Sequence, residues 1–205
     1  VAEVNKIWLF KDVEDNLKKY DEVGYYPEDP ILISDEFPSD KHHGWKYISV
    51  GPDNKLYVPV GAPCNICESR DEIYSTITRM DLDGSNREIF ARGVRNTVGF
   101  TWHPETGEMW FTDNGRDMLG DNYPPCELNR ISKPNEHYGY PYCHGGNISD
   151  PEFGSKYPCD DFIKPVQNLG PHVAPLGVKF YNGNMFPEEY RGCLLYTSDA
   201  ADDRD

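Results

Sequence analysis

Residues 42–61 read HHGWKYISVGPDNKLYVPVG and place two apolar stretches on either side of a Gly-Pro-Asp-Asn turn at 51–54. Proline presets φ in a turn, and Asp and Asn tolerate the tight bend, so this stretch predicts an antiparallel hairpin over 46–60. Two histidines, His42 and His43, come immediately before the first strand. Because imidazole titrates near neutral pH, a histidine at this end of a sheet is a candidate general base; a surface histidine bonded to a nearby carbonyl is the alternative.

The same pattern returns later in the chain. Residues 99–113 read GFTWHPETGEMWFTD, again an apolar strand, a Pro-containing turn and an aromatic strand, and Pro104 follows Pro52 by 52 residues. A period of about 50 residues with several short strands in each unit is typical of β-propeller blades. A strand with an acidic turn precedes each hairpin, at 6–16 and at 76–86. A third, partial copy of the unit covers 176–183 and 191–196.

Three blade-like units cannot close a ring, because propellers need about four to eight blades. The sequence therefore predicts an all-β fragment of a propeller over residues 1–195. The long segment 114–174 is rich in Pro, Gly, Asn and Tyr, and we expect it to be packed rather than structureless. Residues 196–205 are acidic and lack the blade pattern, which indicates a solvated tail or residues that are not native.

Composition narrows the possible partners and compartments. The 20 basic and 35 acidic residues give a formal net charge of -15, which disfavours binding to a nucleic-acid backbone. The chain has no apolar run of about 18 residues that would predict a transmembrane segment, and its first residues do not resemble a secretory signal. Six cysteines, an even number, favour an oxidising compartment, so we expect a periplasmic or secreted protein.

The cysteines also allow hypotheses about pairing. Cys143 and Cys159 bracket a loop that a disulfide could close, and Cys126 and Cys193 could pair at longer range, although sequence does not fix connectivity. The C-x-x-C at 64–67 has no second pair at zinc-site spacing. A structural or locally paired role is therefore favoured over zinc binding or redox catalysis.

Several motifs in a fixed order carry a family resemblance. They are His43 ahead of the 51–57 turn and strand, then GVRN (93–96), TDNG (112–115), ELNRI (127–131), YGYP (138–141) and APLG (174–177). With these motifs the chain resembles the soluble glucose/sorbosone dehydrogenases that depend on pyrroloquinoline quinone (PQQ), and particularly their sorbosone dehydrogenase-like branch. The resemblance implies a six-bladed propeller that uses PQQ and calcium.

The resemblance also implies roles for single residues. His43 matches the family's catalytic base, whereas His42 would point the other way on a strand and ranks lower. Arg95 and Asn96 match a pair that contacts the cofactor, and a guanidinium suits the carboxylates of PQQ. For Arg95 a salt bridge at the end of a blade is the alternative. Asp113, in the TDNG motif, is grouped with these cofactor-binding residues.

Calcium and substrate positions follow in the same way. Gly115 and Arg116 match positions whose backbone carbonyls hold the calcium that bridges to the cofactor. They are therefore expected to belong to both the cofactor site and the metal site. Glu127 and the carbonyl of Tyr138 match a further calcium position, although Glu127 taken alone would be an ordinary exposed acid. His172 is expected to line the substrate cavity or to have a structural role.

The chain departs from the family pattern at two positions. Where glucose-oxidising members have an Asp that orients the catalytic histidine, this chain has Ala62, and Asn65 could only partly replace that carboxylate. Glucose is therefore a poor expectation for the substrate. The Asp that precedes the family's Glu is Cys126 here.

Three functions remain open on the sequence. The first is an oxidoreductase that oxidises an aldose or related sugar aldehyde and passes electrons to an external acceptor. The second is a propeller that binds carbohydrate or protein without turnover, and the third is a calcium-dependent lactonase-like propeller. Fold alone does not separate them. Since family residues that clamp the cofactor from later blades are missing, we expect weak or no turnover from these 205 residues by themselves.

Overall fold

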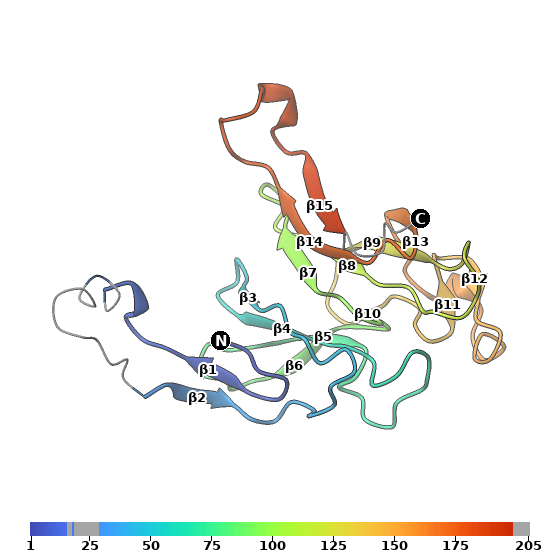
Figure 1. The fold of residues 1–205 in the computed structure, drawn as a ribbon, viewed down its shortest axis with the longest axis horizontal. Coiled ribbons are helices and arrows are strands. Elements are labelled where there is room, and N and C mark those ends of the chain that lie inside the picture. Colours follow the sequence, from blue (N-terminus) through green and yellow to red (C-terminus); the bar gives the residue numbers. More distant parts are fainter. Residues whose placement is uncertain (16–17, 19–28, 199–205) are drawn as a thin grey trace.

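The computed structural model describes residues 1–15, 18 and 29–198. These residues form a mostly β structure of several small sheets (Figure 1), as the sequence predicts. The strands are β1 (Ile7–Leu9), β2 (Ile31–Ser34), β3 (Ser49–Val50), β4 (Leu56–Val60), β5 (Thr76–Met80), β6 (Glu88–Arg92), β7 (Gly99–Trp102), β8 (Met109–Asp113), β9 (Pro125–Ile131), β10 (Glu136–His137), β11 (Cys143–His144), β12 (Ile148–Ser149), β13 (Gln167–Pro171), β14 (Pro175–Phe180) and β15 (Leu194–Ser198), with short 3-10 turns η1 (Cys159–Asp161) and η2 (Glu188–Tyr190).

The hairpin predicted over 46–60 is present. β3 and β4 pair antiparallel, the Gly51 N–H donates to the Lys55 carbonyl at 2.9 Å, and Asn54 takes the φ of 60° that this turn needs. The first strand is shorter than expected, because β3 begins only at Ser49. The two histidines therefore lie in a turn, and the expectation that they point opposite ways on a strand is wrong: the ring centroids of His42 and His43 are 4.0 Å apart.

Two larger sheets carry the rest of the structure. The first has the order β10-β6-β5-β4-β3 and the second has the order β13-β9-β8-β7. The sequence repeat is displaced relative to these sheets. The strand at 76–80 was expected in one unit with 99–113, but β5 pairs with β4 along five residues, and β7 starts the next sheet. The period of the repeat is correct, and only the starting point of each unit differs.

The long segment 114–174 is packed, and it contributes strands that the sequence argument did not assign. β9 pairs with β8 on one side and β13 on the other, so it is central in its sheet. Its polar residues Glu127 and Asn129 are buried. A central strand with buried polar side chains lacks the apolar alternation by which strands are usually found, which explains the omission.

The sheets pack face to face through two apolar clusters. β4 alternates its side chains between them, as the period of two along a strand requires: Leu56, Val58 and Val60 join one cluster and Tyr57 joins the other. The first cluster lies between β1–β2 and the first sheet, and the second lies between the two larger sheets, where Phe100 and Phe111 are almost fully buried. β4 is thus buried along its whole length.

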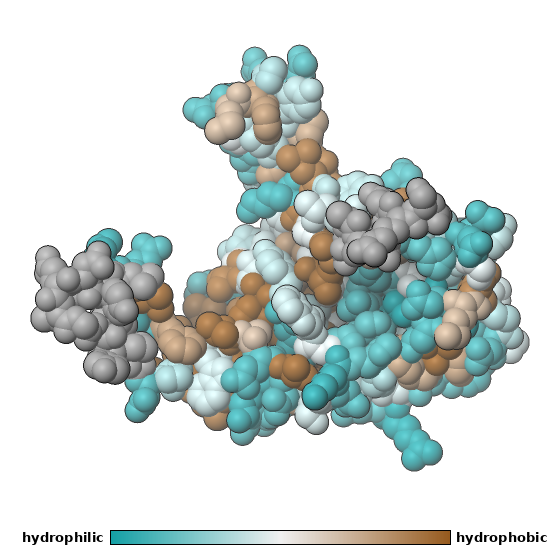
Figure 2. Space-filling view, viewed as in Figure 1, coloured by the Kyte–Doolittle hydropathy of each residue, from teal (hydrophilic) through white to brown (hydrophobic). Residues whose placement is uncertain are grey.

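Antiparallel pairs flank the two sheets. β1 pairs with β2, and β14 pairs with β15 in the hairpin that projects from the molecule in Figure 1. Phe180 of β14 packs edge-on against Trp110 of β8, so the projecting hairpin starts on the outer face of the second sheet. Its tip carries the exposed apolar side chains of Met185 and Phe186, and Leu195 of β15 is exposed as well; hydrophobic colouring is visible along the hairpin in Figure 2.

Four of the six cysteines form disulfides. Cys143 pairs with Cys159 and Cys64 pairs with Cys67, so the loop closure and the local C-x-x-C pairing are confirmed. The possible long-range pair is not formed. Cys126 is buried inside β9, whereas Cys193 is exposed beside β15, and both are free.

Two further observations bear on the ends of the chain and on membranes. β15 runs through Ser198, and most of the predicted tail, residues 199–205, lies outside the described residues. None of the helices in the described part has the length and hydrophobicity needed to cross a bilayer.

Candidate active site at the converging strand ends

His43 is fixed at the end of β4 by contacts with the backbone. Its Nδ1–H donates to the carbonyl of Ala62 at 2.9 Å, and the residue has a φ of 49°. Gly61 makes this approach possible, because a Cβ at that position would lie 2.5 Å from the Cβ of His43. The orienting role therefore falls to the backbone of Ala62. Asn65, which was expected to replace the missing carboxylate in part, bonds to Arg95 instead.

The surroundings keep the imidazole of His43 neutral. Burial, and then the positive charge of Arg95, lower the pKa of His43 to about 4. A carbonyl oxygen only accepts hydrogen bonds, so the Ala62 contact requires the proton on Nδ1 and leaves the lone pair on Nε2. At neutral pH this ring is a base in a defined tautomer.

Arg95 and Asn96 follow β6 and lie beside the end of β4. The Ala62 N–H donates to the Arg95 carbonyl at 2.8 Å, so the backbone of Ala62 contacts both His43 and Arg95. The Arg95 side chain is buried and donates to Asn65 from Nε at 2.9 Å and to the Asn114 carbonyl at 3.1 Å. An ion pair with Asp117 at 3.5 Å completes its contacts, so the salt-bridge alternative describes part of what Arg95 does.

Asp113 shapes the backbone at this point. At the end of β8 its two oxygens accept the N–H groups of Arg95 at 2.8 Å and Asn96 at 2.6 Å. Burial raises the pKa of Asp113 to about 6, although these backbone donors oppose the shift. The carboxylate thus ties the second sheet to the first and sets the direction of the Arg95-Asn96 pair.

Gly115 and Arg116 continue from β8, and their carbonyl oxygens accept no hydrogen bond from the described residues. Free backbone oxygens of this kind are suitable ligands for calcium. Within residues 1–15, 18 and 29–198 no three His, Cys, Asp or Glu side chains gather in a way that could hold a metal ion. Backbone carbonyls would therefore have to supply much of any calcium site here.

Glu127 and Tyr138 line one small cavity together with Asp113 and Gly115. The cavity measures about 10 Å³, which is room for a single water or ion. Burial, and then the charge of Asp113, raise the pKa of Glu127 to about 7. The carboxylate accepts from Gly145 N–H at 2.7 Å and from Asn129 Nδ2 at 3.0 Å.

The neighbouring Asn129 supplies an independent sign of an absent partner. Its Oδ1 is fully buried and has no hydrogen-bond partner among the described residues. An orphaned amide oxygen on a side chain bonded to the Glu127 carboxylate is compatible with a hard cation, which takes oxygen ligands of these kinds. The donor chemistry of Glu127 and Asn129 fits calcium in this respect.

This cavity leads to a prediction for Glu127. In a calcium-free buffer, Glu127→Gln should raise the unfolding free energy at pH 8 by on the order of 2 kcal/mol, because the buried charge is removed. The folded-state pKa is raised above the unfolded value, so the wild type loses stability as pH rises from about 4.5 through about 7. Denaturant unfolding at pH 5 and pH 8 measures the difference.

Added calcium and a control variant provide two further tests of the raised pKa of Glu127. Added calcium should stabilise the wild type at pH 8 more than it stabilises Glu127→Gln. Glu105→Gln, a change at an exposed glutamate, should behave as wild type throughout. Equal pH dependence in the wild type and Glu127→Gln would contradict the assignment of a raised pKa to this residue.

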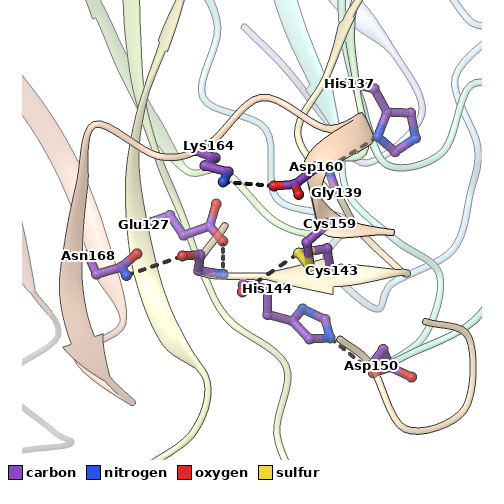
Figure 3. The surroundings of a disulfide bond; sticks show 11 residues. Glu127, His137, Gly139, Cys143, His144, Asp150, Cys159, Asp160, Lys164 and Asn168 are labelled. Carbon is purple, nitrogen blue, oxygen red and sulfur yellow. Dashed lines mark hydrogen bonds and ion pairs between the residues drawn. A yellow bond between two sulfur atoms is a disulfide. The ribbon is translucent and has the colours of Figure 1, made fainter. Parts of the chain in front are cut away.

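A buried ion network lies next to the cavity, and it was not predicted from the sequence. The Asp150 side chain is fully buried and accepts from Arg116 NH1 at 2.6 Å and His144 Nε2 at 2.9 Å (Figure 3 shows the second contact). Burial opposes ionisation of Asp150, but these two partners outweigh it and hold its pKa below the ordinary value. Arg116 thus contributes its backbone to the site while its side chain points into the protein.

His172 is joined to the site through the loop after β8. Its Nε2 lies 3.0 Å from the Gly120 carbonyl and its Nδ1 lies 4.0 Å from Asp117, which also pairs with Arg95. The structure therefore brings His43, Arg95, Asn96, Asp113, Gly115 and Glu127 together, with His172 at the rim. Gly61, His144 and Asp150 were missed, whereas Ala62 and Asn65 were noted only for the carboxylate that this chain lacks.

Comparison with known proteins identifies the family. The family model described as "Glucose / Sorbosone dehydrogenase" matches residues 28–201. The chain belongs to this family. An uncharacterized protein of Borreliella burgdorferi is 38% identical over 194 residues, which cover 93% of this chain and 51% of that protein. The chain thus spans about half the length of this relative.

Solved structures agree with the family assignment. The match to a Trichoderma reesei carbohydrate-active enzyme of family AA12 covers 87% of this chain and 54% of the enzyme's chain, with a TM-score of 0.71 and 19% identity. The match to the PQQ domain of pyranose dehydrogenase from Coprinopsis cinerea covers 89% of this chain and 54% of that domain's chain, with a TM-score of 0.68 and 19% identity. PQQ-bound aldose sugar dehydrogenase from Streptomyces coelicolor matches 78% and 46%, with a TM-score of 0.58 and 25% identity. The fold therefore corresponds to about half of a PQQ sugar dehydrogenase.

Proposed function

We propose that this chain forms about three blades of a six-bladed β-propeller that oxidises an aldose or a related sugar aldehyde with PQQ and calcium. Support comes from the family match, from the similarity to half of several PQQ sugar dehydrogenases, and from sheets that pack face to face. The electrons pass to an external acceptor. Residues 1–195 make up the propeller part in this proposal.

The observation that carries the proposal is the state of His43. Its Nδ1–H is held by the Ala62 carbonyl, and its lowered pKa keeps Nε2 free to take a proton at neutral pH. The absence of the orienting carboxylate at Ala62 would by itself favour a binding module without turnover. A backbone carbonyl fixes the same tautomer, so that objection loses its force.

The chain's own residues divide the work as follows. Nε2 of His43 accepts the proton of the sugar hydroxyl while the carbon that bears it becomes a carbonyl carbon. Bound PQQ supplies the acceptor for the hydride that leaves this carbon. Arg95 places positive charge beside His43, and Asp113 fixes the Arg95-Asn96 backbone toward the cofactor. His172 borders the substrate side through Asp117.

Calcium has two candidate positions in this proposal. The carbonyls of Gly115 and Arg116 would hold the ion next to the cofactor, and Glu127 with the carbonyl of Tyr138 would hold the other. The two disulfides support a periplasmic or secreted location. Glucose is not favoured as the substrate, because the Ala62 site lacks the carboxylate of glucose-oxidising members.

The test is dye reduction by the full-length protein that contains this chain, supplied with calcium and PQQ and assayed with a panel of aldoses and sugar aldehydes. Turnover that requires both cofactors is the expected result, and the 205-residue chain alone should show weak or no activity. Absence of reduction with every sugar, or binding of sugar without reduction, would replace the enzyme proposal with that of a binding module.

A further inference from the structure

The C-x-x-C loop at 64–67 connects β4 to β5 of the first sheet and contacts Arg95 and the segment after β8. Its disulfide closes a turn of four residues, and the hydroxyl of Tyr140 contacts three of them: Sγ of Cys64 at 3.5 Å, the N–H of Cys67 at 3.1 Å and the carbonyl of Asn65 at 3.4 Å. A cross-linked loop has fewer conformations to lose when it is ordered. Asn65 is therefore presented from a rigid support.

Asn65 holds the guanidinium of Arg95 at two points. The Arg95 Nε–H donates to the Asn65 carbonyl at 2.9 Å, and NH2 donates to Asn65 Oδ1 at 2.8 Å. Arg95 is only 5% exposed, so few solvent contacts could replace these bonds. The orientation of this charged group depends on Asn65.

The Asn65 side chain accepts one hydrogen bond from the backbone of Asp117 and donates another to it. Asn65 Oδ1 accepts the Asp117 N–H at 2.9 Å, and Asn65 Nδ2 donates to the Asp117 carbonyl at 3.1 Å. Asp117 directly follows Gly115-Arg116, whose carbonyls are the candidate calcium ligands. An amide is the side chain that offers an acceptor and a donor at once; a carboxylate keeps the first and loses the second.

From these contacts we infer that Asn65 is a positioning residue: the disulfide-closed loop uses its amide to align Arg95 with the 115–117 backbone across the two sheets. This inference rests on the proposed function, because Arg95 and the 115–116 carbonyls are there the groups that face the cofactor and calcium. The side chain of Asn65 bonds to Arg95 and Asp117 and not to His43.

The test compares Asn65→Ala, Asn65→Asp and the control Asn122→Ala, a change at an exposed asparagine, in the full-length protein. PQQ affinity is measured by fluorescence titration with calcium present. Asn65→Ala should weaken binding about 10- to 100-fold, the size expected when a hydrogen bond to a charged group is lost. Asn65→Asp should recover part of this loss, because it retains the acceptor for Arg95, and Asn122→Ala should match the wild type.

A second readout does not need the cofactor. Hydrogen–deuterium exchange of the Asp117 amide should become at least about tenfold faster in Asn65→Ala, while the melting temperature changes little. Unchanged exchange at Asp117, or PQQ affinity equal to that of Asn122→Ala, would overturn the inference, as would a loss of affinity that Asn65→Asp does not reduce. If the wild type itself binds no PQQ, the proposed function fails, whereas the exchange at Asp117 still decides whether Asn65 orders this backbone.

Discussion

Replacing His43 with alanine should lower the turnover of sugar by about 10²- to 10⁴-fold, the range that general-base catalysis contributes. The reason is geometric. The Ala62 carbonyl holds the Nδ1–H of His43 at 2.9 Å, so Nε2 is the one position in this turn where a neutral nitrogen lone pair is fixed beside Arg95. Dye reduction by the full-length protein, with PQQ and calcium at saturation, measures the loss.

The pH profile gives an independent check of the same residue. With the pKa of His43 lowered to about 4, kcat/KM should stay flat from pH 8 to about 5 and fall as the imidazole becomes protonated below that. Folding stability shifts in the same direction. The folded state binds fewer protons than the unfolded state between about pH 4 and 6.5, so the contribution of His43 is lost as pH falls through this window.

His42 is the matched control. Its ring lies 4.0 Å from that of His43 but is exposed, and His42→Ala should keep turnover within a few-fold of wild type. A similar loss in both variants, or full activity in His43→Ala, would remove His43 from the role of base.

The largest effect on stability is expected at Asp150. Asp150→Ala should cost about 3–5 kcal/mol of unfolding free energy, because it leaves the buried guanidinium of Arg116 without its closest counter-charge. The carboxylate also accepts the N–H groups of Glu152 and Phe153 at 2.8 and 3.0 Å, so the turn after β12 loses its support as well. Denaturant unfolding monitored by circular dichroism measures the change.

A nearby carboxylate separates this effect from ordinary surface electrostatics. Glu152 lies 3.6 Å from the same guanidinium but is 60% exposed, and Glu152→Ala should cost about 0–1 kcal/mol. The double variant Asp150→Ala/Arg116→Met should be more stable than Asp150→Ala alone, because no unpaired charge stays buried. Equal costs for the Asp150 and Glu152 variants would show that burial of the network does not matter.

Much of the fold could be predicted because strands and turns leave local signatures. The turn at 51–54, the second hairpin at 99–113 and the pair at 176–196 all occur where residue types favour them. Sheet membership could not be predicted in this way. β5 pairs with β4 rather than with the hairpin that follows it, and main-chain pairing between strands depends on which edges meet after the chain has folded.

The site divides along a similar line. His43, Arg95, Asp113 and Glu127 were chosen by residue type and motif, and the structure brings them to one place. What orients them was not predictable. The Ala62 carbonyl belongs to a residue type with no polar side chain, and a backbone contact leaves no trace in the sequence.

By itself, the sequence determined the all-β class, the repeat and the residues with reactive side chains, because these depend on local periodicity and on chemistry that each residue carries alone. The tertiary structure decided which proton His43 holds, how Asn65 links Arg95 to Asp117, and that Asp150 is buried between Arg116 and His144. Those properties arise from distance, burial and hydrogen bonding between segments far apart in the chain, and they exist only once the two sheets have packed together.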